Sequence, residues 1–150
     1  MSYPYPLSVP PDIKSSLISY LRTKTDLTNV VAADHIVGRV PDYDGVQTAN
    51  WLAIINIGGR DDFHQTIPIF HPHLEAHCMG TNGYESMRIW RYLKAVLEHP
   101  SYRMQGFVSE GLSVYDIRIG LPIEVPDLGV RTWDKRVAPI YMVANEVPIS

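Results

Sequence analysis

The feature that most constrains the fold is one long helix that follows directly on a strand, within residues 71–99. The strand half ends at Gly80, and Asn82 is placed to cap the helix, with Glu85 able to reach back to it in a capping box. Pro100 ends the helix, because proline lacks an amide hydrogen and restricts the residue before it. The apolar face of the helix is predicted to hold Tyr84, Met87, Ile89, Trp90, Leu93, Val96 and Leu97.

Three segments around this helix have the composition of strands. Residues 51–57 form a continuous apolar run, which predicts a strand buried on both faces at the centre of a sheet, followed by a polar turn from Gly58. Residues 67–79 predict a second strand, in which Pro72 indicates an edge position or a bulge. Residues 137–144 are apolar on both faces, which predicts either a central strand or a subunit contact.

The segment 107–125 carries the clearest alternation of apolar and polar residues in the chain. Its last eleven residues predict a strand of about 36 Å, and Pro122 indicates an edge position or a bend. Side chains at every second position are expected to share one face of the sheet. These residues are Tyr115, Ile117, Ile119, Leu121, Ile123 and Val125.

A shorter helix is predicted near the N-terminus, capped by Asp12, and residues 30–40 predict a short strand. Residues 1–11 contain four prolines and two tyrosines, which predicts an extended tail ahead of a single domain over residues 12–150. The expected fold class is α+β: one mostly antiparallel sheet of four to five strands, a principal helix packed across it and a shorter N-terminal helix. The apolar face of the short helix is Ile13, Leu17, Ile18 and Leu21.

The composition argues against several classes of protein. A chain of 150 residues with 45% hydrophobic and 19% charged residues is typical of a globular domain with its own core. A net charge of −3 argues against a surface that binds nucleic acid electrostatically. Cys78 is the only cysteine, which excludes an intrachain disulfide and fits assembly in a reducing cytoplasm. The N-terminus does not have the pattern of a signal peptide, and no apolar run approaches the roughly 20 residues of a membrane span.

One cluster has the residue types of a metal site. Four polar residues fall at alternating positions of the predicted second strand, so their side chains are expected on one face: His71, His73, Glu75 and His77. Histidine pairs at this spacing can bind one ion from one side. A solvent-facing polar row or a subunit contact has the same pattern, and Pro72 disturbs the alternation. We therefore expect no metal and no cofactor, and keep a metal-binding enzyme or ligand module as an alternative.

The other candidates for catalysis are weak. Cys78 follows His77 directly, and adjacent strand residues face opposite sides, so the two cannot form a Cys–His couple. A buried structural thiol is the expected role of Cys78. The glycine pair at Gly58 opens no helix, so it is not a phosphate-binding loop. The sequence thus predicts a protein that is not an enzyme, with Arg131 and Trp133 as a plausible contact pair.

The order of elements carries a resemblance to a known family. A short helix and two strands are followed by a capped helix, G-T-N-G-Y-E-S-M-R-I-W-R-Y-L, after a strand that ends C-M-G. A β segment and a closing P-D-L-G-V-R-T-W-D-K-R-V-A-P-I-Y-M-V come next. This pattern resembles the tail terminator (tail completion) proteins of long-tailed bacteriophages over residues 10–145, and most closely over 84–97 and 133–143. The proline-rich start and the histidine row have no counterpart in that pattern.

The resemblance implies a structural virion protein of the tail or neck, assembled in the host cytoplasm. Such proteins form a homo-hexameric ring that caps the tail tube, stops its polymerisation and provides the head-docking surface. The implied partners are the tail tube protein on one side and a head-completion (neck) protein on the other, with DNA passing through the channel without being read and no membrane involved. Another neck, connector or baseplate component, or a bacterial tube-and-sheath relative, is the nearest alternative.

A ring of this kind needs two different contact patches on each subunit, because a heterologous interface joins unlike surfaces. The tail, the alternating strand and the loop before the last strand are the segments expected to supply them. The candidate contact residues are Tyr3, Tyr5, Tyr115, Ile117, Ile119, Arg131 and Trp133.

Overall fold

The computed structural model describes residues 12–41, 49–62, 69–99, 107–109, 112–125 and 134–146. The N-terminal segment with Tyr3 and Tyr5, and the loop with Arg131 and Trp133, lie outside the described residues. In chain order the elements are α1 (Ile13–Arg22), α2 (Thr25–Thr28), the 3₁₀ turn η1 (Ala33–His35), β1 (Ile36–Val37), β2 (Trp51–Asp62), β3 (Ile69–Gly80), α3 (Gly83–Glu98), β4 (Phe107–Ser109), β5 (Leu112–Ile119), β6 (Ile123–Glu124) and β7 (Asp134–Glu146).

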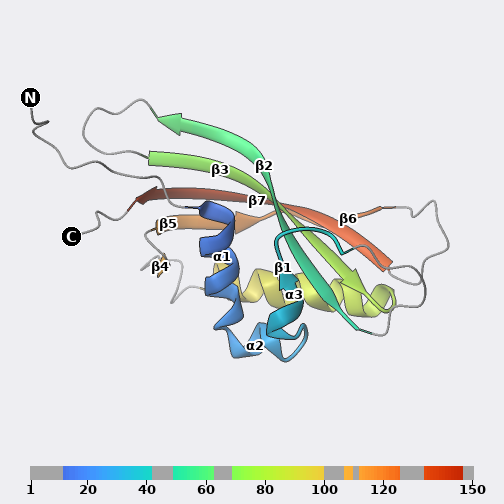
Figure 1. Ribbon diagram of the computed structural model, residues 1–150. Coiled ribbons are helices and arrows are strands. Elements are labelled where there is room, and N and C mark those ends of the chain that lie inside the picture. The colour runs from blue at the N-terminus through green and yellow to red at the C-terminus, as the bar shows by residue number, and fades with distance from the viewer. Residues whose placement is uncertain are drawn as a thin grey trace, which may run out of the picture.

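The strands form one sheet in the order β1-β2-β3-β7-β5-β4, and β6 also pairs with β7. All pairings are antiparallel except that of β1 with β2, which is parallel. Figure 1 shows the three helices together on one side of this sheet. The predicted α+β class, with a principal helix across the sheet and a shorter N-terminal helix, is confirmed. Four long strands, β2, β3, β5 and β7, carry the sheet, because β1, β4 and β6 hold only two or three residues each.

Helix α3 begins as its cap predicts. The side chain of Asn82 accepts a hydrogen bond from the backbone amide of Glu85 at 2.9 Å. The second hydrogen bond of the predicted capping box, from the cap residue back to the side chain of Glu85, is wrong. The carboxylate of Glu85 accepts from Asn50 Nδ2 at 2.8 Å instead. Tyr84 was predicted on the apolar face but is 70% exposed, since it lies in the first turn of the helix, where the residue that packs on the sheet is Ser86.

The core lies between the helices and the inner face of the sheet. It consists of apolar side chains from α1 and α3 and from alternating positions of the four long strands. Trp90 closes one side of this core, and its indole Nε1 donates to the carbonyl oxygen of Gly120 at 3.0 Å. Among the largest fully buried side chains are Leu17, Leu21, Leu27, Ile36, Leu52, Ile54, Leu74, Ile89, Leu93, Leu97 and Leu112.

The central position predicted for β2 was wrong, and so was the edge alternative for β3. β2 lies next to the edge of the sheet, and β1 covers it only at Leu52 and Ala53. β3 is central, between β2 and β7, although Pro72 suggested an edge strand. The proline has a local effect instead: the β3–β7 ladder is interrupted between Phe70 and His73, because proline cannot donate to it.

β2 does not end at the turn predicted from Gly58 but bends there and continues to Asp62. A register shift lies between Asn56 and Gly58, and Asn56 Oδ1 accepts from the amide of Gly58 at 3.0 Å. Gly58 and Gly59 have φ angles of 116° and 128°, which side chains rarely allow. A Cβ atom on Gly59 would also lie 2.3 Å from the carbonyl oxygen of His71. The glycine pair therefore makes a bend in a continuous hairpin.

The predicted uninterrupted strand within residues 107–125 was also wrong. A bulge lies between Val114 and Asp116, and it changes which residues face the core. Tyr115 is exposed, whereas Ile117 and Ile119, which were expected on the same face, are buried. β5 ends at Ile119, and the chain then passes through Gly120 to β6, which pairs with β7 at the other end of that strand.

Candidate functional site

The histidine row lies on the face of the sheet opposite the helices. Its residues alternate with Leu74, Ala76 and Cys78, which are buried on the helical side, so the predicted common face is confirmed. Glu75 Oε2 lies 3.0 Å from Nε2 of His77. The ring of His73 meets Tyr141 of β7 edge-on, with centroids 5.1 Å apart. The row consists of His71, His73, Glu75 and His77.

These side chains do not converge on one point. In the part of the chain that the structure describes, no three His, Cys, Asp or Glu side chains form a group that can hold a metal ion. Burial lowers the pKa of His77, while its hydrogen bond with Glu75 acts in the opposite direction. The Nδ1 atom of His77 is buried and has no hydrogen-bond partner among the described residues. The row is therefore a polar strip held by neighbouring pairs.

Cys78 lies in the core, as predicted. The thiol is fully buried, and burial raises its pKa to about 12. Because the thiolate is the reactive form, Cys78 is chemically inert in the folded chain.

A polar cluster that the sequence did not reveal joins α3 to β7. Ser86 is fully buried and its hydroxyl donates to Asp134. The Nε atom of Arg136 lies 3.2 Å from Oγ of Ser86 and 3.1 Å from Oδ1 of Asp134. Gly80 allows this close approach, because a Cβ atom there would lie 2.3 Å from the amide nitrogen of Ser86. The only local signals were a serine on an apolar helix face and two charges spaced by two residues on a strand.

Asn50 makes a second connection at the same end of α3. Its side-chain amide donates to the carbonyl of Val30 and to Glu85, and its oxygen accepts from the amide of Thr81 at 3.3 Å. These bonds tie the start of β2 to the β3–α3 turn. Both polar groups fix how α3 lies on the sheet. The hydroxyl of Ser86 does meet a carboxylate, that of Asp134, but Ser86 is fully buried and so is out of reach of a substrate.

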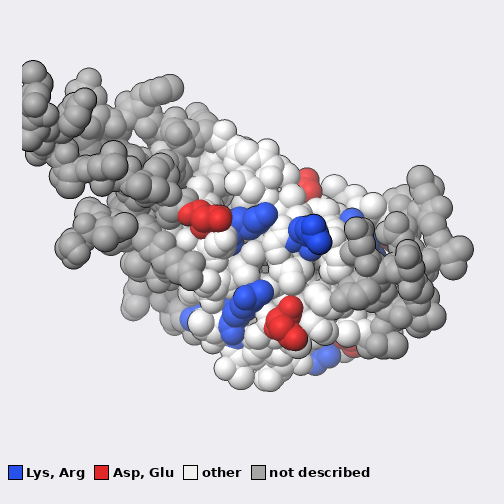
Figure 2. All heavy atoms as spheres, in the orientation of Figure 1, with Lys and Arg blue, Asp and Glu red and all other residues white. Residues whose placement is uncertain are grey.

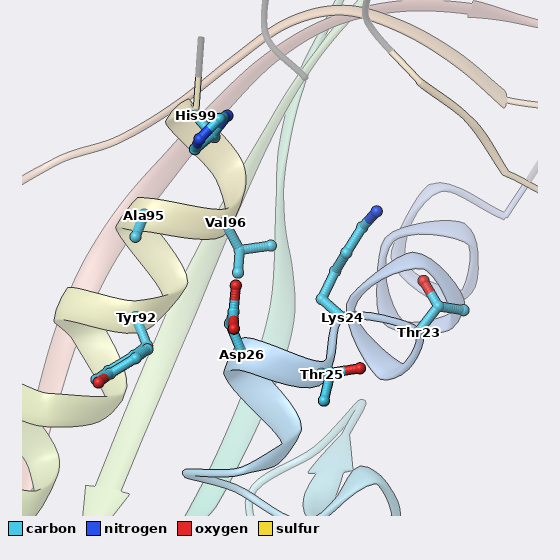
Figure 3. A pocket seen from close by; sticks show the side chains of 8 residues that line it. All are labelled: Thr23, Lys24, Thr25, Asp26, Tyr92, Ala95, Val96 and His99. Atoms are coloured by element: carbon cyan, nitrogen blue, oxygen red, sulfur yellow. The ribbon is translucent and has the colours of Figure 1, made fainter. Parts of the chain in front are cut away.

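A pocket of about 390 Å³ opens on the helical side (Figure 3). Lys24, Asp26 and His99 bring charges of both signs to its wall, beside the ring of Tyr92 and the apolar side chain of Val96. They come from the start of α2 and the C-terminal part of α3, as Figure 3 shows. This lining is mixed, without the convergent acid, base and nucleophile of a catalytic site. The pocket is lined by Thr23, Lys24, Thr25, Asp26, Tyr92, Ala95, Val96 and His99.

Exposed apolar side chains concentrate along one edge of the sheet. Of the eight large ones among the described residues, four lie within residues 115–125. Tyr115, a predicted contact residue, is 53% exposed, whereas Ile117 and Ile119 are 2% and 5% exposed. A contact along this strand would therefore use Tyr115 and its exposed neighbours, while the two isoleucines pack in the subunit's own core. The eight are Ile57, Tyr84, Tyr92, Tyr115, Leu121, Ile123, Val125 and Tyr141.

The face of the molecule shown in Figure 2 has a mixed charge. Figure 2 shows basic and acidic side chains interspersed on the face that it presents, without a continuous basic stripe. Such a surface is unlike the basic patches that grip nucleic-acid backbones. None of the helices in the described residues is long and apolar enough to cross a membrane.

Comparison with known proteins relates the chain to others by fold. No protein-family model matches it, and no curated protein matches its sequence. Seven chains of solved structures match, and one of them belongs to the virion of a native gene transfer agent (GTA) particle. The two chains superpose with a TM-score of 0.57 at 9% identity, over 90% of this chain and 95% of the other. This chain therefore shares its fold, over nearly its whole length, with a chain of a gene transfer agent virion.

Proposed function

We propose that this chain is a structural, non-enzymatic component of a phage-like virion. The observation that carries the proposal is the shared fold with the gene transfer agent chain, because the match spans 90% of one chain and 95% of the other and so leaves little of either fold unaccounted for. The resemblance of the element order to tail terminator proteins supports the same class independently.

Within such a particle, the proposed role is a homo-hexameric ring that caps the tail tube. One face of the ring complements the last ring of tube protein, and the other face does not template a further one, so polymerisation stops. The second face then receives the head-completion protein, and DNA passes through the channel without being read. The mixed surface charge suits this passage, because few phosphate contacts means weak retention of DNA.

The arrangement of the subunit favours such a role. All three helices lie on one side of the sheet (Figure 1). Among the described residues, long parts of two edges have no strand partner, and the opposite face carries only the small apolar cluster around Ala53 and Met79. The Ser86–Asp134–Arg136 cluster fixes α3 against β7, which gives the subunit a rigid body for repeated contacts. A heterologous ring needs two unlike patches on one rigid body.

Light scattering of the purified protein, with metal analysis of the same sample, tests the ring. A particle of about six subunits without metal is expected, and electron microscopy should show it as a ring with a central channel. A monomer with stoichiometric metal would contradict the proposal and support a metal-binding module on the histidine row.

A second assay separates the tube cap from other neck or baseplate components. Tube protein of the same virus is polymerised with and without this chain, and tube length is measured by electron microscopy. A tube cap should stop elongation when it is added, and its rings should be found at tube ends. Rings that form but leave elongation unchanged would assign the chain to another part of the neck or baseplate.

A further inference from the structure

The first free edge of the sheet belongs to β2. β3 pairs with β2 along its whole length, but β1 pairs with the other side only at Leu52 and Ala53. From Ile54 to Asp62 that side has no strand partner among the described residues, which leaves roughly 30 Å of edge. An unpaired edge presents backbone N–H and C=O groups that only another strand can pair regularly. Ile57, 51% exposed, lies within it.

The second free edge runs along β5 and β6. β4 pairs with β5 only at Leu112, Ser113 and Val114. Beyond Val114, the sides of β5 and β6 that face away from β7 have no strand partner in the described part of the chain. This is the edge on which the exposed apolar side chains concentrate, including Leu121 at 78% and Ile123 at 68% exposure.

We propose that these two edges bind one another between copies of this chain, with the β2 edge of one subunit pairing with the β5–β6 edge of the next. The inference rests on the proposed ring and names the surfaces that would close it. The two edges are unlike and lie on opposite sides of the sheet, so the contact is heterologous. Each subunit then uses both edges, and a closed ring leaves none unpaired, which removes the hazard that an open edge creates.

A second copy is the occupant because the chain itself supplies both unlike edges, and the charges at the edges are compatible with that pairing. Lys14 and the exposed Arg39 lie where β1 gives way to the free edge of β2, with Lys14 Nζ donating to the carbonyl of Gly38 at 3.0 Å. The exposed Glu124 lies on the β6 edge. Each edge also carries the other sign, with Asp61 and Asp62 in β2 and Arg118 in β5, so charges on one edge have counterparts on the other.

The bend in β2 gives this edge a second property. Asn56, Ile57, Gly58 and Gly59 are exposed, so the hairpin stands clear of the core at this point. The two positive φ angles bend β2 at this point, while β3 beyond the bend stays paired with β7 at Ile69 and Phe70. A strand that stands clear can reach a neighbouring subunit without a clash between the two helical layers.

Thiol cross-linking tests the proposal with Ile57→Cys and Ile123→Cys. The buried Cys78 does not compete, because its thiol is inaccessible in the folded chain. Cross-linkers with reaches from roughly 10 Å to roughly 30 Å cover the registers that an edge of this length allows. Co-expressed single variants should form cross-linked dimers, whereas each variant alone should form none. The double variant should form a ladder that ends in a closed ring without free thiols.

Two outcomes would overturn the edge pairing. Dimers from a single variant alone would show an isologous contact, and an oligomer of the correct mass that does not cross-link in the mixture would place the contact elsewhere. In both cases the virion role would stand, whereas a protein that stays monomeric by light scattering would overturn the self-assembled ring as well. Tyr84→Cys on α3, which is also highly exposed, is the matched control and should not cross-link with Ile57→Cys.

Discussion

Gly80 occupies a position at the end of β3 where no side chain fits. A Cβ atom there would lie 2.3 Å from the backbone nitrogen of Ser86, which cannot move without shifting α3. We expect Gly80→Ala to lower the free energy of unfolding by about 2 kcal/mol, measured by urea denaturation. Gly38→Ala is the control, because its nearest neighbour is the flexible side chain of Lys14 at 3.3 Å. An equal decrease in the free energy of unfolding in the two variants would contradict the interpretation that Gly80 is required by its contact with the backbone of Ser86.

His77 should make stability depend on pH. Burial holds its pKa below the ordinary value of 6.5, so the unfolded chain binds a proton more readily than the folded chain. The contribution to stability is therefore complete above the unfolded pKa and is lost as the pH falls from that value through the folded pKa. Glu75 and Lys135 also act on this titration. Urea denaturation between about pH 7.5 and about pH 5 should show a smaller decrease for His77→Gln than for the natural chain. An identical decrease in both chains would assign the effect to other groups.

The burial and orientation of a single residue could be predicted from the sequence where they depend only on its neighbours in the chain. The burial of Cys78 and the common face of the histidine row followed from strand alternation alone. The Ser86–Asp134 contact was not predictable, because 48 residues separate its partners and each has an ordinary local reading. Tyr3, Tyr5, Arg131 and Trp133 lie outside the described residues, so their proposed contacts remain predictions.

At the scale of the element, the cap of α3 is the clearest test. Asn82→Ala removes the acceptor for the amide of Glu85 and should cost about 1 kcal/mol of stability. Asn82→Asp keeps an acceptor at the same place and should cost much less. Thermal unfolding of both variants, followed by circular dichroism, checks the difference. A loss of the same size in both would show that the cap does not depend on this hydrogen bond.

Element types were predictable from periodicity, but the interruptions of the strands were not. The pattern within 107–125 is equally compatible with one long strand and with two pieces around a bulge, because an extra residue at Tyr115 leaves the neighbouring alternation intact. Pro72 likewise indicated either an edge position or a local irregularity of the strand. The β3–β7 ladder is interrupted at this residue, but β3 is central, since a central strand can lose pairs locally and remain in the sheet.

At the scale of the whole molecule, the proposed edge contact predicts that a charge placed in either edge dissociates the oligomer without changing the fold of the chain. Ile57→Asp and Ile123→Asp each place a charge in one free edge, where the natural side chain packs against nothing within the subunit core. Light scattering should show each variant as a single chain of 17.0 kDa, with circular dichroism unchanged. Tyr84→Asp, at a similarly exposed site, should keep the mass of the natural protein. Retention of the oligomer in both edge variants would exclude the contact.

The order of strands was the least predictable property of the molecule. Residues 51–57 are apolar in succession, which favoured a central strand, yet β2 lies next to the edge. The face of β2 that points away from the helices is partly covered by Val37 and Val40, which pack against Ala53 and Met79. A strand can therefore be apolar on both faces without lying at the centre of the sheet. Which strands lie side by side in a sheet depends on contacts between distant parts of the chain, and the sequence of a single segment does not reveal those contacts.

The position of β7 has a consequence for the synthesis of this protein. Among the described strands, β3 and β5 are linked by strand pairing only through β7, although α3 packs against both, and β7 follows all the other described strands in the chain. While the ribosome is still making the earlier segments, the β2–β3 hairpin and the β4–β5 hairpin have no strand between them that would join them into one sheet. Release of residues 134–146 unites them. A nascent or truncated chain therefore lacks the completed sheet, and in the proposed ring only a chain translated through β7 would bring both edges to one sheet.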